Sequence, residues 1–201
     1  KDINQEKREW NFLGFIDETP EKQGEIINDN PVLGGFEWLD KNRSRNIWSV
    51  CAVGDTRGRF KLVQKAKDCN VNFANLIHPT VVKNDYINMG EGNVICWNTF
   101  LSVNIKLGSH VIINPGCGIG HDTVVEDYVT LYWDVTLAGC VSVGKGCEIG
   151  SKAFVIQNKS VGKWSILGAG AIAVKDIPDR CTAVGVPAKP IKFTGTDFTN
   201  Y

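Results

Sequence analysis

The side chains of this sequence best suited to move a proton at neutral pH are its three histidines, His78, His110 and His121. His121 is followed directly by Asp122, and a carboxylate beside an imidazole fixes the ring tautomer and raises its basicity. We therefore predict that His121 is a general base and that Asp122 supports it. We interpret His78 and His110 as structural residues.

A six-residue repeat surrounds this pair. From Met89 to Leu167 every sixth residue is aliphatic, and the residue four places later is usually small or β-branched. This period is typical of a parallel β-helix built from hexapeptides, in which three hexapeptides close one coil. The aliphatic residue points into a narrow prism and the small residue fills a corner. Residues eighteen apart then stack on neighbouring coils, about 4.8 Å from each other.

Gly139 stands eighteen residues after His121, so the repeat places it one coil further along the same face. A glycine exposes its N–H, which could donate a hydrogen bond to the carbonyl oxygen of an acyl group beside His121. The alternative interpretation is an ordinary corner glycine. By the same count Ser151 and Ala169 stack on each other, on a different face from His121.

The first part of the chain has a different pattern. The apolar runs at 12–17 and 47–55 end in acidic or glycine turns, as strands of a parallel sheet do. Residues 59–69 have helical spacing. We interpret this region as the later part of a Rossmann-like α/β unit, whose opening strand and Gly-rich turn would precede Lys1.

These patterns predict three segments. Residues 1–75 form the Rossmann-like domain, and residues 76–177 form the β-helix. Residues 178–201 are punctuated by proline and glycine and are predicted to leave the prism as an extended arm.

Composition excludes several classes of function. The 22 basic residues balance the 22 acidic ones, so the electrostatic footprint of a nucleic-acid-binding protein is missing. No apolar run approaches the roughly 18 residues needed to span a bilayer, so we expect no membrane insertion. The seven cysteines include no CxxC pair, which favours free thiols in a reducing cytoplasm and predicts no metal site.

Several stretches together resemble a known family of enzymes, the sugar acetyltransferases of the sialic-acid O-acetyltransferase type. This family includes the nucleotide-amino-sugar N-acetyltransferases. The similar stretches are FLGFIDE, VCAVGDTRGR, LIHPT, INPGCGIGHDTVVEDY, LAGCVSVGKGCEIGS, ILGAGAIAVKDI and AVGVPAKPI.

The resemblance implies a left-handed β-helix, a homotrimer and acetyl-CoA as co-substrate, with His121 as the base. It also implies two sets of binding residues. Those at the family's acetyl-CoA positions are Thr130, Ser151 and Ala169. Those at its sugar-nucleotide positions are Asp17, Glu18, Gly54, Arg57 and Asn114. Because His121 and Ser151 belong to different faces of the prism, we expect the cofactor to lie in a cleft between neighbouring subunits.

We predict acetyl transfer from acetyl-CoA to the amine of a nucleotide-linked amino sugar. One alternative is O-acetylation of a sugar hydroxyl, and another is a binding module that kept the prism without catalysis. Zinc-dependent hydration of carbon dioxide would need three converging histidines, which this sequence does not offer. Trp97 and Trp133 share one face, two coils apart, and are predicted to point outward into a subunit contact or the wall of a cofactor cleft.

Overall fold

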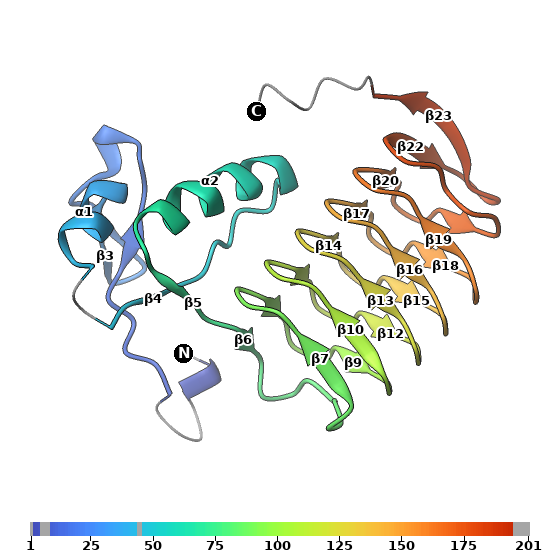
Figure 1. Ribbon diagram of the computed structural model, residues 1–201, viewed down its shortest axis with the longest axis horizontal. Helices are drawn as coiled ribbons and strands as arrows, with labels where there is room; N and C mark the ends of the chain where they lie inside the picture. The colour runs from blue at the N-terminus through green and yellow to red at the C-terminus, as the bar shows by residue number, and fades with distance from the viewer. Residues whose placement is uncertain (1, 5–8, 44–45, 195–201) are drawn as a thin grey trace.

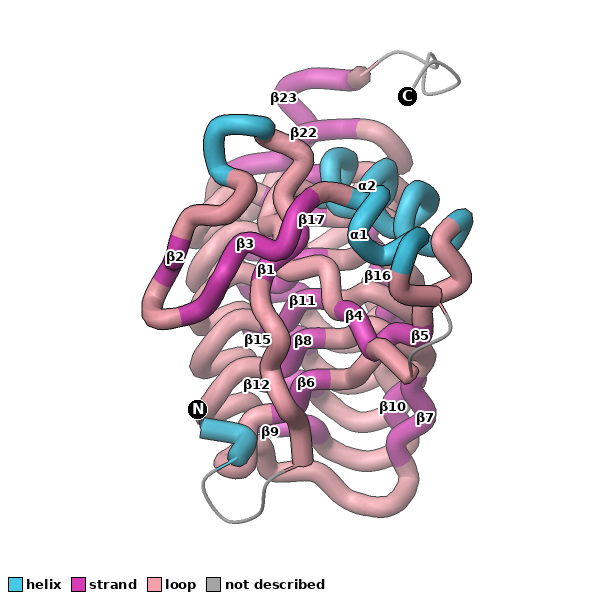
Figure 2. The backbone as a smooth tube through the Cα atoms, turned by 90° about the vertical axis from the view of Figure 1, so that its left-hand side faces the viewer, coloured by secondary structure: helices cyan, strands magenta, loops and turns pink. Residues whose placement is uncertain are grey.

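Two parts with different architectures make up the chain. The computed structural model describes residues 2–4, 9–43 and 46–194. From residue 76 onward the chain winds into a stack of coils, and the preceding helices and short strands lie against one side of that stack (Figures 1 and 2).

Three sheets form the sides of the coiled part, and we name them sheets A, B and C. Sheet A contains β6 (Leu76–Ile77), β8 (Val94–Ile95), β11 (Ile112–Ile113), β14 (Thr130–Leu131), β17 (Glu148–Ile149), β20 (Ile166–Leu167), β22 (Cys181–Val184) and β23 (Lys189–Phe193). Sheet B contains β9 (Phe100–Leu101), β12 (Gly118–Ile119), β15 (Thr136–Leu137), β18 (Phe154–Val155) and β21 (Ile172–Ala173). Sheet C contains β7 (Ile87–Met89), β10 (Ile105–Leu107), β13 (Val124–Val125), β16 (Ser142–Val143) and β19 (Ser160–Val161).

The repeat in the sequence is the repeat of the structure. Ile113 pairs in parallel with Leu131, and Leu131 pairs with Ile149, so each coil takes eighteen residues. These side chains are fully buried, as are Val129 and Cys147, which fill the corners. The prediction of a parallel β-helix is confirmed. The prism is so narrow that only an inward aliphatic residue and a small corner residue fit inside it, which explains the repeat.

The seven cysteines are all free thiols. Burial raises the pKa of the Cys117 and Cys147 thiols to about 12, so both stay protonated and act as small apolar core residues. Among the described residues, the helices are too short and too polar to cross a bilayer.

The β-helix continues past residue 177, where the sequence predicted an extended arm. β22 pairs in parallel with β20, and Ile166 lies opposite Thr182. The two paired residues are sixteen apart instead of eighteen, so the six-residue repeat does not predict this strand. β23 then turns back antiparallel to β22 and is exposed throughout. The end of the predicted arm, residues 195–201, lies outside the described residues.

The first part of the chain is built from short elements. One small sheet contains β1 (Phe15–Ile16), β3 (Asn30–Gly34) and β2 (Ile26–Ile27), in that order. A second contains β4 (Trp48–Ser49) and β5 (Asn72–Phe73). The helices are α1 (Phe36–Lys41) and α2 (Thr56–Asp68), with 3-10 turns at Asp2–Asn4 and Pro20–Lys22.

These elements match the predicted positions but not the predicted lengths. β1 and β4 each take two residues from the longer apolar runs at 12–17 and 47–55. The helix predicted at 59–69 begins earlier, at Thr56, because the Asp55 carboxylate accepts a hydrogen bond from the Gly58 N–H and caps it. β1–β3 and β4–β5 pair in parallel, as in an α/β unit, but they belong to separate sheets.

Candidate active site

His121 and Asp122 form a hydrogen-bonded pair at the corner between β12 and β13. His121 Nδ1 lies 2.8 Å from Asp122 Oδ2, and the two side chains are 49% and 50% exposed. The hydrogen bond from His121, followed by one from Asn104 Nδ2 at 3.0 Å, lowers the pKa of the Asp122 carboxyl. An ionised carboxylate only accepts hydrogen bonds, so Nδ1 carries the proton and Nε2 is left as the basic nitrogen.

Gly139 lies directly against this basic nitrogen. A Cβ added at Gly139 would overlap His121 Nε2. The contact follows from the coil geometry, in which the Cys140 N–H donates to the His121 carbonyl at 2.8 Å. A residue with a side chain at position 139 would push the imidazole aside, whereas glycine leaves Nε2 accessible.

The residues predicted to bind acetyl-CoA do not lie at this corner. Ser151 and Ala169 lie at the corners that precede sheet B, whereas His121 follows it. Trp97 and Trp133 share that edge with them, and their rings form an edge-to-face pair with centroids 6.1 Å apart. Both tryptophans are about half exposed, as the sequence predicted.

Thr130, the third residue predicted to bind acetyl-CoA, is buried. Its side chain is 1% exposed. Its Oγ1 lies 3.1 Å from Thr56 Oγ1 and accepts a hydrogen bond from Arg59 at 2.8 Å. Thr130 points outward from sheet A, but α2 covers it, which the repeat alone could not indicate.

The residues predicted to bind a sugar nucleotide are divided between the two parts of the chain. Asp17 accepts hydrogen bonds from the Thr19 N–H and from Lys22, and these lower the pKa of its carboxyl to about 2. Glu18 accepts a hydrogen bond from the Phe36 N–H at the start of α1. Asp17 therefore organises its own loop, whereas Glu18 connects that loop to α1.

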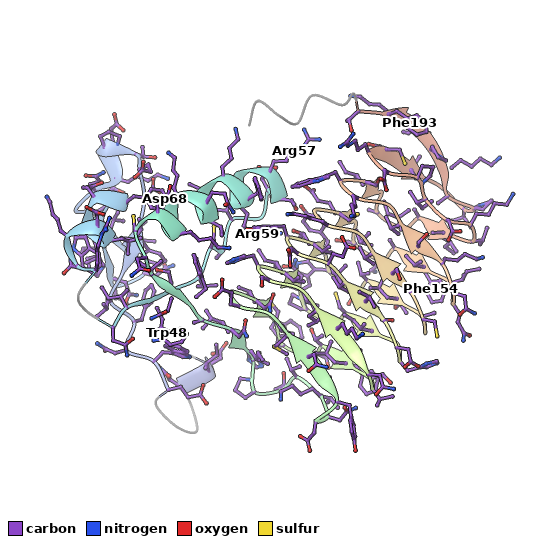
Figure 3. The ribbon with its side chains drawn as sticks, in the orientation of Figure 1. Trp48, Arg57, Arg59, Asp68, Phe154 and Phe193 are labelled. Atoms are coloured by element: carbon purple, nitrogen blue, oxygen red, sulfur yellow. The ribbon has the colours of Figure 1, made fainter. Side chains whose placement is uncertain are left out.

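Gly54, Arg57 and Asn114 complete that predicted set. Gly54 is exposed and has open space where a side chain would stand. Arg57 is exposed at the beginning of α2 (Figure 3). Asn114 lies at the corner before β12, and its amide donates to the Leu131 carbonyl at 2.9 Å.

Arg59 is a residue that the sequence reading missed. Its guanidinium is completely buried between α2 and the β-helix (Figure 3). It donates to the carbonyls of Val53 and Gly54 on one side, and to those of His110 and Tyr128 on the other. Burial lowers the pKa of this arginine. Its N–H groups donate to backbone carbonyls on both sides, so Arg59 anchors the loop that carries Gly54 to the coils.

Several solved acetyltransferase structures are similar to this chain over most of its length. A histidine-to-asparagine mutant of perosamine N-acetyltransferase from Caulobacter crescentus, in complex with CoA and GDP-perosamine, is 32% identical. The match covers 89% of this chain and 84% of that one, with a TM-score of 0.84. The acetyltransferase domain of PglB from Neisseria gonorrhoeae, in complex with acetyl coenzyme A, is 29% identical over 90% and 87% of the two chains, with a TM-score of 0.84. The parallel sheets are consistent with the left-handed β-helix that the resemblance implied.

Curated relatives match less than half of the chain. A serine acetyltransferase from Buchnera aphidicola is 36% identical, and the match covers 47% of this chain and 42% of that protein. One from Synechococcus elongatus is 32% identical over 45% of this chain and 41% of its own length. The chain therefore spans about two-fifths of the length of these relatives. No protein-family model matches it.

Proposed function

This chain belongs to the hexapeptide-repeat family of sugar acetyltransferases, and we propose that it transfers the acetyl group of acetyl-CoA to the amine of a nucleotide-linked amino sugar. The observation that carries the proposal is the geometry of one corner. Asp122 holds the proton on His121 Nδ1, and Gly139 leaves the basic Nε2 accessible. The likeness to perosamine N-acetyltransferase supports the choice of a sugar amine as acceptor.

In the proposed reaction the neutral amine attacks the thioester carbonyl carbon. A C–N bond forms, and His121 Nε2 takes a proton from the nitrogen as the tetrahedral intermediate develops. The Gly139 N–H is proposed to donate a hydrogen bond to the negative oxygen of that intermediate. The C–S bond then breaks, and the imidazolium returns the proton to the departing CoA thiolate. Asp122 stabilises the imidazolium between these two steps.

The binding residues are proposed to converge only in an assembly. The width of sheet B separates His121 from Ser151 and Ala169 within one chain. A homotrimer would bring the corner of one subunit beside that of its neighbour, with acetyl-CoA in the cleft between them. The exposed Trp97 and Trp133 pair, at the same edge as Ser151, suits such a contact.

Residues 1–75 are proposed to hold the sugar nucleotide as a Rossmann-like domain. Arg57 is exposed at the start of α2, where its guanidinium is proposed to contact a phosphate. Gly54 leaves room for close approach, and Asn114 would contact the sugar nucleotide from the coil side. Free thiols throughout the chain fit a cytoplasmic enzyme.

The proposal is tested by competition between acceptors. An amino-sugar nucleotide and its hydroxyl counterpart are offered at equal concentration with acetyl-CoA, and both acetylated products are measured by mass spectrometry. We expect a higher kcat/KM for the amine. Faster acetylation of the hydroxyl compound, or of a free sugar, would establish O-acetylation instead.

A further inference from the structure

Cys140 brings a thiol next to the proposed catalytic pair without any role in the proposed reaction. One imidazole nitrogen of His121, a carboxylate oxygen of Asp122 and Cys140 Sγ all lie within 4.8 Å of one another. The side chains of His121 and Asp122 are about half exposed and Cys140 is partly exposed, so an ion from solvent can reach the cluster.

The coil geometry fixes this arrangement. Cys140 stands eighteen residues after Asp122, and both have left-handed backbones, with φ of 58° and 57°. The Cys140 N–H donates to the His121 carbonyl at 2.8 Å, so the thiol is held beside the ring by a backbone hydrogen bond. One coil below, Asn104 Nδ2 donates to Asp122 Oδ1 at 3.0 Å and orients that carboxylate.

The three donor types select one class of metal. Thiolate and imidazole suit zinc, whereas calcium and magnesium prefer all-oxygen sites. Zinc binds nitrogen at about 2.0 Å and sulfur at about 2.3 Å. Side-chain rotations that move each donor atom by about 1 Å would therefore let all three donors contact one ion. Asn104 supplies the kind of outer hydrogen bond that orients a ligating carboxylate.

We propose that His121, Asp122 and Cys140 bind a zinc ion that inhibits the enzyme by occupying the imidazole of its base. The thiol loses its proton to water when the ion binds, and a water molecule completes the tetrahedral shell. The metal site itself follows from the donor geometry alone. Inhibition rests in addition on the proposed function, because it requires that His121 act as base.

Direct binding is tested with cobalt as a spectroscopic substitute for zinc. Tag-free wild-type protein is titrated with Co²⁺, and we expect one ion per chain with a thiolate-to-cobalt charge-transfer band that zinc removes. Cys140→Ser should abolish the band. Cys96→Ser is the matched control, because Cys96 is also partly exposed but lies outside the cluster, and it should keep the band. A band that survives in Cys140→Ser, or no band in the wild type, would overturn the proposal.

Inhibition is measured by mass spectrometry of the acetylated product, since zinc would disturb any assay that detects the CoA thiol. We expect zinc to inhibit the wild type, and a chelator to restore its activity. In Cys140→Ser the inhibitory zinc concentration should rise at least ~10-fold, the scale on which even outer-sphere partners affect metal affinity. Equal zinc sensitivity in both proteins would refute inhibition through this site. If the wild type shows the cobalt band but zinc leaves its activity intact, the metal site stands and the role of His121 as base fails.

Discussion

Two polar clusters on this β-helix differ in what surrounds them. At the His121 corner, the imidazole and its carboxylate are about half exposed and are held by contacts within neighbouring coils. At the junction with α2, Arg59 and His110 are almost completely buried. The first cluster is open to solvent, whereas the second is enclosed by the protein. The comparison predicts that changes at the corner affect activity and that changes at the junction affect stability.

The largest expected effect is on turnover at the corner. His121→Ala should lower kcat by about 10²- to 10⁴-fold, the usual contribution of a general base. The melting temperature should stay near the wild-type value, because the side chain is half exposed. His78→Ala is the control, since His78 bonds locally to Thr80. Near-normal turnover in His121→Ala would place the base elsewhere.

At the junction the largest expected effect is on stability. Arg59→Met should reduce the free energy of unfolding by about 3 kcal/mol, because it leaves buried carbonyls without donors. The KM for the sugar nucleotide should also rise, since the Val53 and Gly54 carbonyls lose their anchor. Lys61→Met, at an exposed position of the same helix, should change stability by less than about 0.5 kcal/mol. Denaturant unfolding of both variants checks this, and equal stabilities would contradict the anchoring role.

The two clusters also differ in how far the sequence could predict them. The eighteen-residue repeat predicts that Gly139 stacks on His121. The adjacency of His121 and Asp122 in the sequence indicates the hydrogen-bonded pair, so the corner can be predicted from local spacing. The junction depends on how α2 docks. Arg59 stands among other basic residues of α2 and shows no sign of burial in the sequence. Thr130, outward-facing by the repeat, is covered for the same reason. The strand β22 was missed where a shorter corner breaks the count.

A substitution at Gly139 is expected to affect activity more than stability, as for the other residues of the corner. Gly139→Ala should lower kcat by about 10²-fold, because its Cβ would displace the imidazole by a distance on the order of an ångström. Stability should change little, since the exposed ring can swing aside. Gly118→Ala is the control, because a Cβ at Gly118, in the strand that precedes His121, would meet open space. A large drop in melting temperature with unchanged turnover per folded molecule would show that Gly139 is only a corner residue.

His110 makes the stability of the junction depend on pH. Its ring is 1% exposed, stacks on Tyr128 and meets Phe73 edge to face. Among the residues that the structure describes, neither ring nitrogen has a hydrogen-bond partner. Burial is the main cause that lowers its pKa from 6.5 to about 4. The neutral ring is therefore favoured in the folded state, so the stability it supports is complete above pH 6.5 and is lost as the pH falls toward 4.

These two pKa values correspond to a loss of about 2 kcal/mol between pH 7 and pH 5. His110→Phe keeps an aromatic ring between Tyr128 and Phe73 but removes the titrating group. Its absolute stability also reflects the fit of a larger ring, so the informative quantity is the slope of unfolding free energy against pH. We expect the wild type to lose about 2 kcal/mol more than His110→Phe over this interval, while His78→Gln follows the wild type. Parallel curves for the wild type and His110→Phe would mean that the buried imidazole carries no such penalty, and the contrast between corner and junction would then rest on Arg59 alone.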